Sequence, residues 1–130
     1  MVRQGSGAIV NVSSVASITT ISVPMISYYS SKAGVNHCTR AVAVEYASKG
    51  IRCNAVLPGL INTPMIVEPY KHVYDSVDDM IAKRDAMVPM GKMGMAWDVA
   101  HASLFLASNE AKYISGVLLP VDGALTCRTG

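Results

Sequence analysis

Tyr28 and Lys32 are two residues whose types and spacing could do chemistry together. They stand four residues apart, and positions i and i+4 of a helix lie one above the other on the same face. An ammonium beside a phenol favours the phenolate, so such a pair can give and take a proton near neutral pH. Tyr29 is the poorer candidate, because the residue four positions after it is Ala33. The spacing alone also fits an ordinary helix face, so the surrounding motifs must decide.

The elements that must position this pair follow an alternating pattern. Short apolar runs rich in β-branched residues are typical of strands in a parallel sheet, and longer runs with apolar residues at helical spacing are typical of helices. The pattern predicts strands at 8–13, 51–57 and from 116 onward, and helices at 28–48 and 96–108. This order predicts an α/β fold, namely a partial Rossmann-like, doubly wound parallel sheet of three strands with right-handed crossover helices. Pro120 cannot donate to a ladder, so the last strand is expected at an edge or a bulge.

Two loops are expected at the carboxyl ends of these strands, where open α/β sheets bind their ligands. The first is the Ser- and Thr-rich segment 14–27, and the second begins at the Pro58-Gly59 break. Beyond it, 64–94 is interpreted as a substrate-loop insertion that is rich in methionine and has a helical piece at 76–87. Methionine fills irregular apolar space adaptably. The insertion is therefore either a cover over a mostly apolar substrate or ordinary core filling.

Composition and charge limit the class of protein. The 130 residues fit a single domain spanning 1–130, and 51% apolar against 15% charged residues is enough for a core. A net charge of +2 without a basic stripe predicts no nucleic-acid partner. The start of the given sequence has no apolar core long enough for a signal peptide, and no later apolar run approaches the length of a membrane span, so no membrane association is expected. Three cysteines without a C-x-x-C pair suit a reducing compartment, and we expect a cytoplasmic protein.

The glycines near the start do not form a dinucleotide fingerprint. That fingerprint has glycines at its first, third and sixth positions and follows a strand. Here Gly5 and Gly7 are followed by Val10 and precede the predicted strand. The histidines also lack metal-ligand spacing, so no metal is assigned to His37, His72 or His101.

Four motifs occur in order along the chain: Asn11-Val12-Ser13-Ser14, Tyr28-x-x-x-Lys32-Ala33-Gly34, the run from Asn54 to Thr63, and the run from Gly116 to Gly123. In this order and spacing the chain resembles the compact single-domain short-chain dehydrogenases/reductases. Members of that family run to roughly twice this length and open with a Gly-rich nucleotide loop. That loop and the residues that select the cofactor have no counterpart here. We therefore expect the C-terminal half of such a domain, with NAD or NADP as the cofactor.

The resemblance implies catalytic roles for three residues. Tyr28 matches the family's acid/base, which passes a proton to or from the substrate oxygen while a hydride moves between the substrate carbon and the nicotinamide. Lys32 matches the residue that activates this tyrosine and hydrogen-bonds the nicotinamide ribose, so both residues also count as cofactor-binding. Ser14 is our choice for the serine that holds the substrate oxygen. It stands 14 residues before Tyr28, one more than is commonest in the family, so Ser13 and Ser17 stay open as alternatives.

The segment after the second predicted strand matches the family's nicotinamide-side loop. Its implied cofactor-binding residues are Pro58, Gly59, Ile61 and Thr63. In the family, backbone groups at the Ile61 position meet the carboxamide, and the hydroxyl at the Thr63 position reaches the carboxamide or the diphosphate. Glycine lets backbone approach a ligand closely, and a hydroxyl supplies a neutral donor.

The resulting hypothesis is an NAD(P)-dependent oxidoreductase that acts on a small secondary alcohol or ketone. It is expected to form a homo-oligomer, a dimer or tetramer in the intact enzyme. An epimerase or dehydratase with the same tyrosine–lysine pair remains an alternative, and so does a non-catalytic fragment that serves only as an assembly partner. The isolated chain is expected to bind cofactor poorly and to self-associate through an exposed strand edge.

Overall fold

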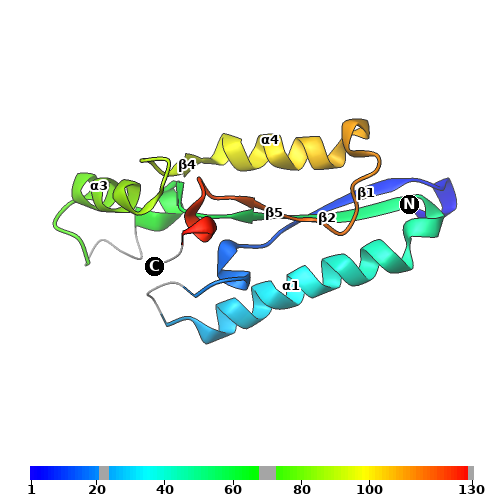
Figure 1. Cartoon of the computed structure of the whole chain (residues 1–130), viewed down its shortest axis with the longest axis horizontal. Helices are drawn as coiled ribbons and strands as arrows, with labels where there is room; N and C mark the ends of the chain where they lie inside the picture. Colours follow the sequence, from blue (N-terminus) through cyan, green and yellow to red (C-terminus); the bar gives the residue numbers. More distant parts are fainter. Residues whose placement is uncertain (21–23, 68–72, 129–130) are drawn as a thin grey trace.

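The computed structural model describes residues 1–20, 24–67 and 73–128 (Figure 1). Its strands are β1 (Gly7–Val12), β2 (Ile51–Pro58), β3 (Ile61–Asn62), β4 (Gly94–Met95) and β5 (Leu118–Val121). Its α-helices are α1 (Ile26–Glu45), α3 (Val77–Met87) and α4 (Ala96–Ala107). Short 3-10 helices lie at Val2–Gln4, Val15–Ser17, Ala47–Lys49, Pro64–Ile66, Asn109–Ala111 and Leu125–Cys127. His72 and part of the expected insertion, 68–72, lie outside the described residues.

The main sheet has three strands in the order β1-β2-β5, and both pairings are parallel. In the register, Gly7 lies opposite Ile51 in the first pair, and Ala55 lies opposite Leu118 in the second. Figure 1 shows α1 along one face of this sheet and α4 along the other. The expected α/β fold with crossover helices on both faces is therefore confirmed.

The middle strand β2 contributes fully buried residues to the hydrophobic core. Cys53, Ala55, Val56 and Leu57 have no exposed surface, and Leu57 packs with Val15 and Leu118. Such a continuous apolar run is typical of a strand covered on both faces. β5 lies at the edge of the sheet with Pro120 inside it, which confirms the position expected from a residue that cannot donate to a ladder.

Several element boundaries differ from the expected ones. Helix α1 begins at Ile26, two residues earlier than expected, and Met25 makes no side-chain capping bond, so capping residues in the sequence could not indicate its start. It ends at Glu45 rather than Ser48, because a 3-10 turn at Ala47–Lys49 follows and leads into Gly50 with φ +70°. The last strand begins at Leu118 rather than at residue 116.

The segment 64–94 is held at its base by a second, two-stranded parallel sheet. In it, Ile61 of β3 pairs with Gly94 of β4, and Asn62 pairs with Met95. Two-residue strands have no periodicity that a sequence pattern could detect. The pairing brings the two ends of the segment together, so α3 projects from a closed loop beside the main sheet (Figure 1).

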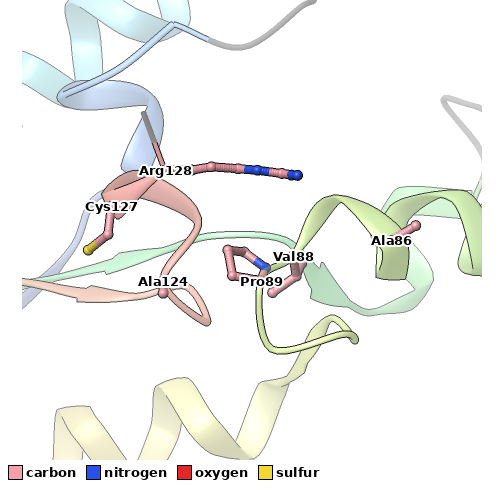
Figure 2. Close-up of a pocket in the computed structure, with 6 residues that line it drawn as sticks. All are labelled: Ala86, Val88, Pro89, Ala124, Cys127 and Arg128. Carbon is pink, nitrogen blue, oxygen red and sulfur yellow. The ribbon is translucent and has the colours of Figure 1, made fainter. Parts of the chain in front are cut away.

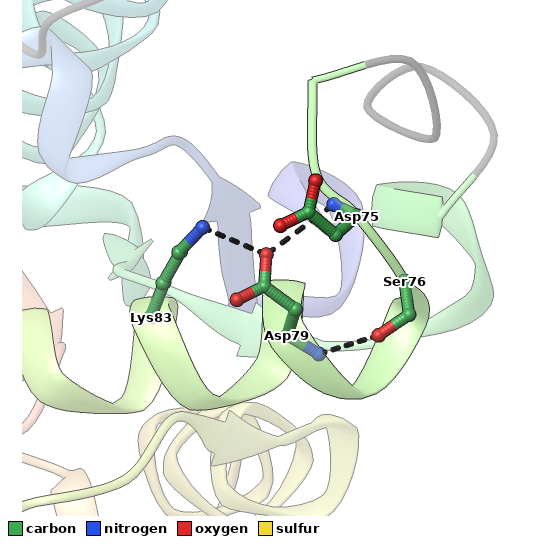
Figure 3. Close-up of polar contacts among 4 residues, drawn as sticks. All are labelled: Asp75, Ser76, Asp79 and Lys83. Carbon is green, nitrogen blue, oxygen red and sulfur yellow. Dashed lines mark hydrogen bonds and ion pairs between the residues drawn. The ribbon is translucent and has the colours of Figure 1, made fainter.

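Within this segment, the helical piece expected at 76–87 is confirmed as α3. Ser76 accepts a hydrogen bond from the Asp79 amide at 3.0 Å, as a helix N-cap does (Figure 3). Asp79 in turn accepts from Lys83 Nζ at 2.8 Å and from the Asp75 amide at 3.3 Å. The hydrogen bond from Lys83 lowers the pKa of Asp79 below its ordinary value. These contacts order the first turns of α3, although the exposed ion pair contributes little to stability.

Helix α1 exposes one large apolar side chain near each of its ends. Ile26 is 80% exposed and Val44 is 81% exposed. The sequence predicts a helix covered on more than one side, and within the described residues the sheet covers only one of them. None of the helices in the described ranges is long and apolar enough to cross a lipid bilayer.

The chain after β5 turns on Asp122 and Gly123. The Asp122 carboxylate accepts hydrogen bonds from the amides of Ala124 at 3.0 Å and Thr126 at 2.9 Å, as expected of an Asp-Gly turn. Gly123 has φ +60°, and a Cβ at this position would lie 2.5 Å from Val88 Cγ1. Ala124 follows with φ +69° and lines a cavity of about 440 Å³ together with Pro89, Cys127 and other residues (Figure 2). An alanine in this backbone region is strained.

We expect Ala124→Gly to raise the free energy of unfolding by about 0.5–1 kcal/mol. Glycine removes the left-handed strain of about 1–2 kcal/mol, and part of this gain is offset by the greater freedom of glycine in the unfolded chain. The matched control is Ala100→Gly on the exposed side of α4, which should lower stability by about 1 kcal/mol. Denaturant unfolding measures both. A loss of stability in Ala124→Gly would show that the turn is not strained.

The three cysteines differ in exposure, and none forms a disulfide. Burial in β2 raises the pKa of the Cys53 thiol above its ordinary value, whereas Cys38 and Cys127 are exposed. Because the thiolate is the reactive form, we expect iodoacetamide at pH 8 to modify Cys38 and Cys127 in the folded protein and to leave Cys53 unmodified until denaturant is added. Peptide mass spectrometry measures the labelling. Modification of Cys53 at the rate of the other two would contradict the burial of β2.

Candidate active site

A cavity of about 410 Å³ lies where β1 and β2 end. All of the residues that the sequence analysis assigns to catalysis or cofactor binding line it: Ser14, Tyr28, Lys32, Pro58, Gly59, Ile61 and Thr63. They come from the chain just after β1, the first turns of α1, and the last residue of β2 with the segment that follows it. Parallel strands bring their carboxyl ends to one edge of the sheet, which is why segments so far apart in the sequence meet there.

Tyr28 and Lys32 lie one above the other at the start of α1. The Lys32 ammonium is 5.7 Å from the centroid of the Tyr28 ring. It also donates a hydrogen bond of 3.1 Å to the carbonyl oxygen of Val12, the last residue of β1. Lys32 therefore links the helix to the end of the strand and keeps a positive charge beside the Tyr28 phenol. Tyr28 is 38% exposed.

The three candidate serines use their hydroxyls differently. Ser13 donates to the carbonyl oxygen of Lys32 at 3.2 Å, and Ser17 donates to the carbonyl oxygen of Ser14. The Ser14 hydroxyl accepts a bond of 3.1 Å from the Ala16 amide, and its proton has no acceptor within the described part of the chain. Ser13 and Ser14 both line the cavity, whereas Ser17 lines a neighbouring cavity with Tyr29. Of the three, only Ser14 combines a place in the cavity with a donor that is free of intramolecular bonds in the described ranges.

The loop after β2 is shaped by contacts that the sequence does not indicate. A Cβ at Gly59 would lie 2.6 Å from the Asp122 Cβ, so glycine is needed here for contact with the chain after β5. The sequence argument was instead that glycine lets a ligand approach. Thr63 precedes the short helix Pro64–Ile66 as its N-cap residue, and within the described ranges its side chain makes no capping bond.

The rest of the cavity wall is mostly apolar and contains one charged residue that the sequence analysis missed. Its remaining residues are Val12, Leu60, Met65, Ile66, Arg84, Ala96 and Val99. Arg84 is 9% exposed, and its guanidinium carbon lies 6.0 Å from the centroid of the Tyr74 ring. The available signal was spacing: Met80, Arg84 and Val88 follow one another at intervals of four, and all three are buried.

The fold is that of a Rossmann-type α/β protein, and comparison with known proteins defines the class further. A family model described as enoyl-(acyl carrier protein) reductase matches residues 1–126. A crystal structure of a putative short-chain dehydrogenase/reductase from Burkholderia xenovorans superposes with a TM-score of 0.88 at 41% identity, covering 100% of this chain and 47% of that one. The chain belongs to the short-chain dehydrogenase/reductase family.

Two relatives with assigned activities are dehydrogenases. The 2-(R)-hydroxypropyl-CoM dehydrogenase of Xanthobacter autotrophicus is 43% identical over 127 residues, which are 97% of this chain and 48% of that protein. The 3beta-hydroxysteroid dehydrogenase 1 of Eggerthella lenta is 41% identical over 129 residues, which are 98% of this chain and 47% of that protein. A structure of ElxO with NADP bound has a TM-score of 0.86 at 34% identity and covers 98% of this chain and 50% of that one. The chain spans about half the length of the relatives that it matches.

Proposed function

We propose that this chain is the catalytic half of an NAD(P)-dependent oxidoreductase that interconverts a secondary alcohol and a ketone. The observation that carries the proposal is the meeting of Ser14, Tyr28 and Lys32 with the Pro58–Thr63 loop in one cavity. The dehydrogenase activities of its relatives support this reaction over an epimerase or dehydratase.

In the proposed mechanism, the Tyr28 hydroxyl donates its proton to the substrate oxygen during ketone reduction and takes it back during alcohol oxidation. The Lys32 ammonium, 5.7 Å from the ring, stabilises the negative charge on the phenolate. The Ser14 hydroxyl, which is free to donate, holds the substrate oxygen and stabilises the charge that develops on it.

The donors in the cavity fit the nicotinamide end of the cofactor. Lys32 Nζ and the Tyr28 hydroxyl suit the ribose, and the Thr63 hydroxyl and the backbone at Ile61 suit the carboxamide. The bound cofactor supplies or accepts the hydride. NADP is bound by the similar ElxO, and this chain contains no residue that would distinguish NADP from NAD, so the proposal includes both.

The exposed surfaces support a homo-oligomer. Ile26 and Val44 of α1 are exposed, and among the described residues β1 pairs with a strand on one side only. A second copy, or further chain of the same polypeptide, would cover them. For the isolated 130 residues, weak cofactor binding and self-association remain our prediction.

The test is turnover by the polypeptide that the natural reading frame encodes. NAD⁺ and NADP⁺ are each supplied with a panel of secondary alcohols, and formation of the reduced nicotinamide is followed by absorbance. The proposal requires turnover with at least one combination of cofactor and alcohol, and it requires that the Tyr28→Phe variant lose this turnover. Turnover that is unaffected by this substitution would contradict it.

A further inference from the structure

A buried asparagine on α1 reaches the loop that carries Ser14. Asn36 is 6% exposed, and its Nδ2 donates a hydrogen bond of 2.6 Å to Ser17 Oγ. Ser17 Oγ in turn donates to the carbonyl oxygen of Ser14 at 2.5 Å. The three residues form a chain of hydrogen bonds from the helix to the backbone of the candidate catalytic serine.

The direction of this chain is set by the number of protons available. A serine hydroxyl has one proton, and Ser17 uses it on the Ser14 carbonyl. Its oxygen must therefore accept from its other neighbour, and an amide NH₂ can donate there. The Asn36 Oδ1 atom is buried and has no hydrogen-bond partner among the described residues, which costs free energy. An aliphatic side chain at this position would avoid that cost but would leave Ser17 without its donor.

The helix also places Asn36 in line with the catalytic pair. Tyr28, Lys32 and Asn36 follow one another at intervals of four residues, so they lie along one face of α1. Tyr28 and Lys32 line the cavity directly, and Asn36 is linked through Ser17 to Ser14, which also lines it. One helix face thus holds the acid/base, its activating ammonium and the support of the serine loop.

We propose that Asn36 is a positioning residue that acts through Ser17 to set the place of Ser14 relative to Tyr28. The proposal rests on the role of Ser14 given under Proposed function. It assigns Asn36 no contact with substrate or cofactor. Its effect is on the geometry in which Ser14 meets the substrate oxygen, where an error of about 1 Å can cost about 100-fold in rate.

The first experiment measures the loop itself and does not depend on turnover. Hydrogen exchange is followed at the amides of Ser17 and Ile18, which bond to the carbonyls of Ser14 and Val15 at 3.0 Å each. We expect Asn36→Leu and Ser17→Ala each to speed this exchange by about 10-fold or more, because the loop opens locally. The control is Thr39→Val, which removes a fully buried hydroxyl three residues further along α1 that bonds to Asn11 instead. Equal protection of the loop in all variants would overturn the proposal.

The second experiment measures catalysis in the polypeptide of the natural reading frame. Asn36→Leu and Ser17→Ala should each lower kcat by about 10-fold with a small change in KM, and the double variant should be no worse than either single variant, because the two residues act in series. Thr39→Val should keep kcat within about 2-fold at a comparable loss of stability. Multiplied effects in the double variant would overturn the proposal. If Tyr28→Phe retains full turnover, the proposed function itself is wrong, and the exchange experiment alone decides whether Asn36 positions the loop.

Discussion

Replacement of Tyr28 by phenylalanine is expected to lower kcat by about 10²–10⁴-fold, the range that a general acid–base group contributes. The substitution removes the hydroxyl group, which is the only part of this side chain that could exchange a proton with the substrate. It keeps the ring beside Lys32. Stability should change by less than about 0.5 kcal/mol, because the side chain is partly exposed and its hydroxyl makes no hydrogen bond in the described ranges. Steady-state kinetics and thermal unfolding of the same sample measure both effects.

Tyr29→Phe is the matched control for this prediction. Tyr29 is the next residue of the same helix, but it lines the neighbouring cavity with Ser17 and Ala33 and not the one that contains Lys32. Its kcat should stay within about 3-fold of the unsubstituted protein. If both tyrosine variants lost activity equally, the effect would belong to the helix and not to a proton transfer at Tyr28.

Replacement of Asn54 by alanine is expected to lower the free energy of unfolding by about 2–4 kcal/mol. Asn54 lies in β2 with no exposed surface. Its Nδ2 donates to the carbonyl of Ile114 at 2.9 Å, and its Oδ1 accepts from the amide of Val117 at 3.0 Å, so it holds the segment that leads into β5. Alanine leaves the part-buried Val117 amide without this partner and the Ile114 carbonyl with only a 3.3 Å contact from Arg52.

The control for Asn54 is Asn109→Ala, an exposed asparagine at the 3-10 turn after α4. Its stability should change by less than about 0.5 kcal/mol. Urea unfolding of the two variants gives the comparison directly. A loss below about 1 kcal/mol in Asn54→Ala would mean that water or a shifted backbone replaces both hydrogen bonds.

Local patterns in the sequence were sufficient for the sheet and for the tyrosine–lysine pair. The β-branched runs place β1 and β2, and the four-residue spacing of Tyr28 and Lys32 yields the observed contact, because the helix alone determines which of its side chains are neighbours. The two-residue strands β3 and β4 could not be predicted, because their pairing depends on residues more than 30 positions apart and leaves no local signal.

The contacts that hold the loops of the site in place also could not be predicted from the sequence. Asn36 and Ser17 are 19 residues apart, and an asparagine within a helical run of small and apolar residues has no property that identifies its partner. The same holds for position 59, where glycine is needed because Asp122, just beyond the end of the neighbouring strand β5, lies too close for a Cβ. Such residues are determined by tertiary packing, so they become visible only when the folded chain brings distant segments together.

The central claim is that the cavity between the start of α1 and the loop after β2 is a nicotinamide site. The most direct measurement is a crystal structure of the polypeptide from the natural reading frame grown with NADP⁺ and, separately, with NAD⁺. We predict the nicotinamide ring inside this cavity, with Lys32 at the ribose and the Ile61–Thr63 backbone and hydroxyl at the carboxamide. A nicotinamide bound outside this cavity, with Tyr28 and Lys32 remote from it, would contradict the claim.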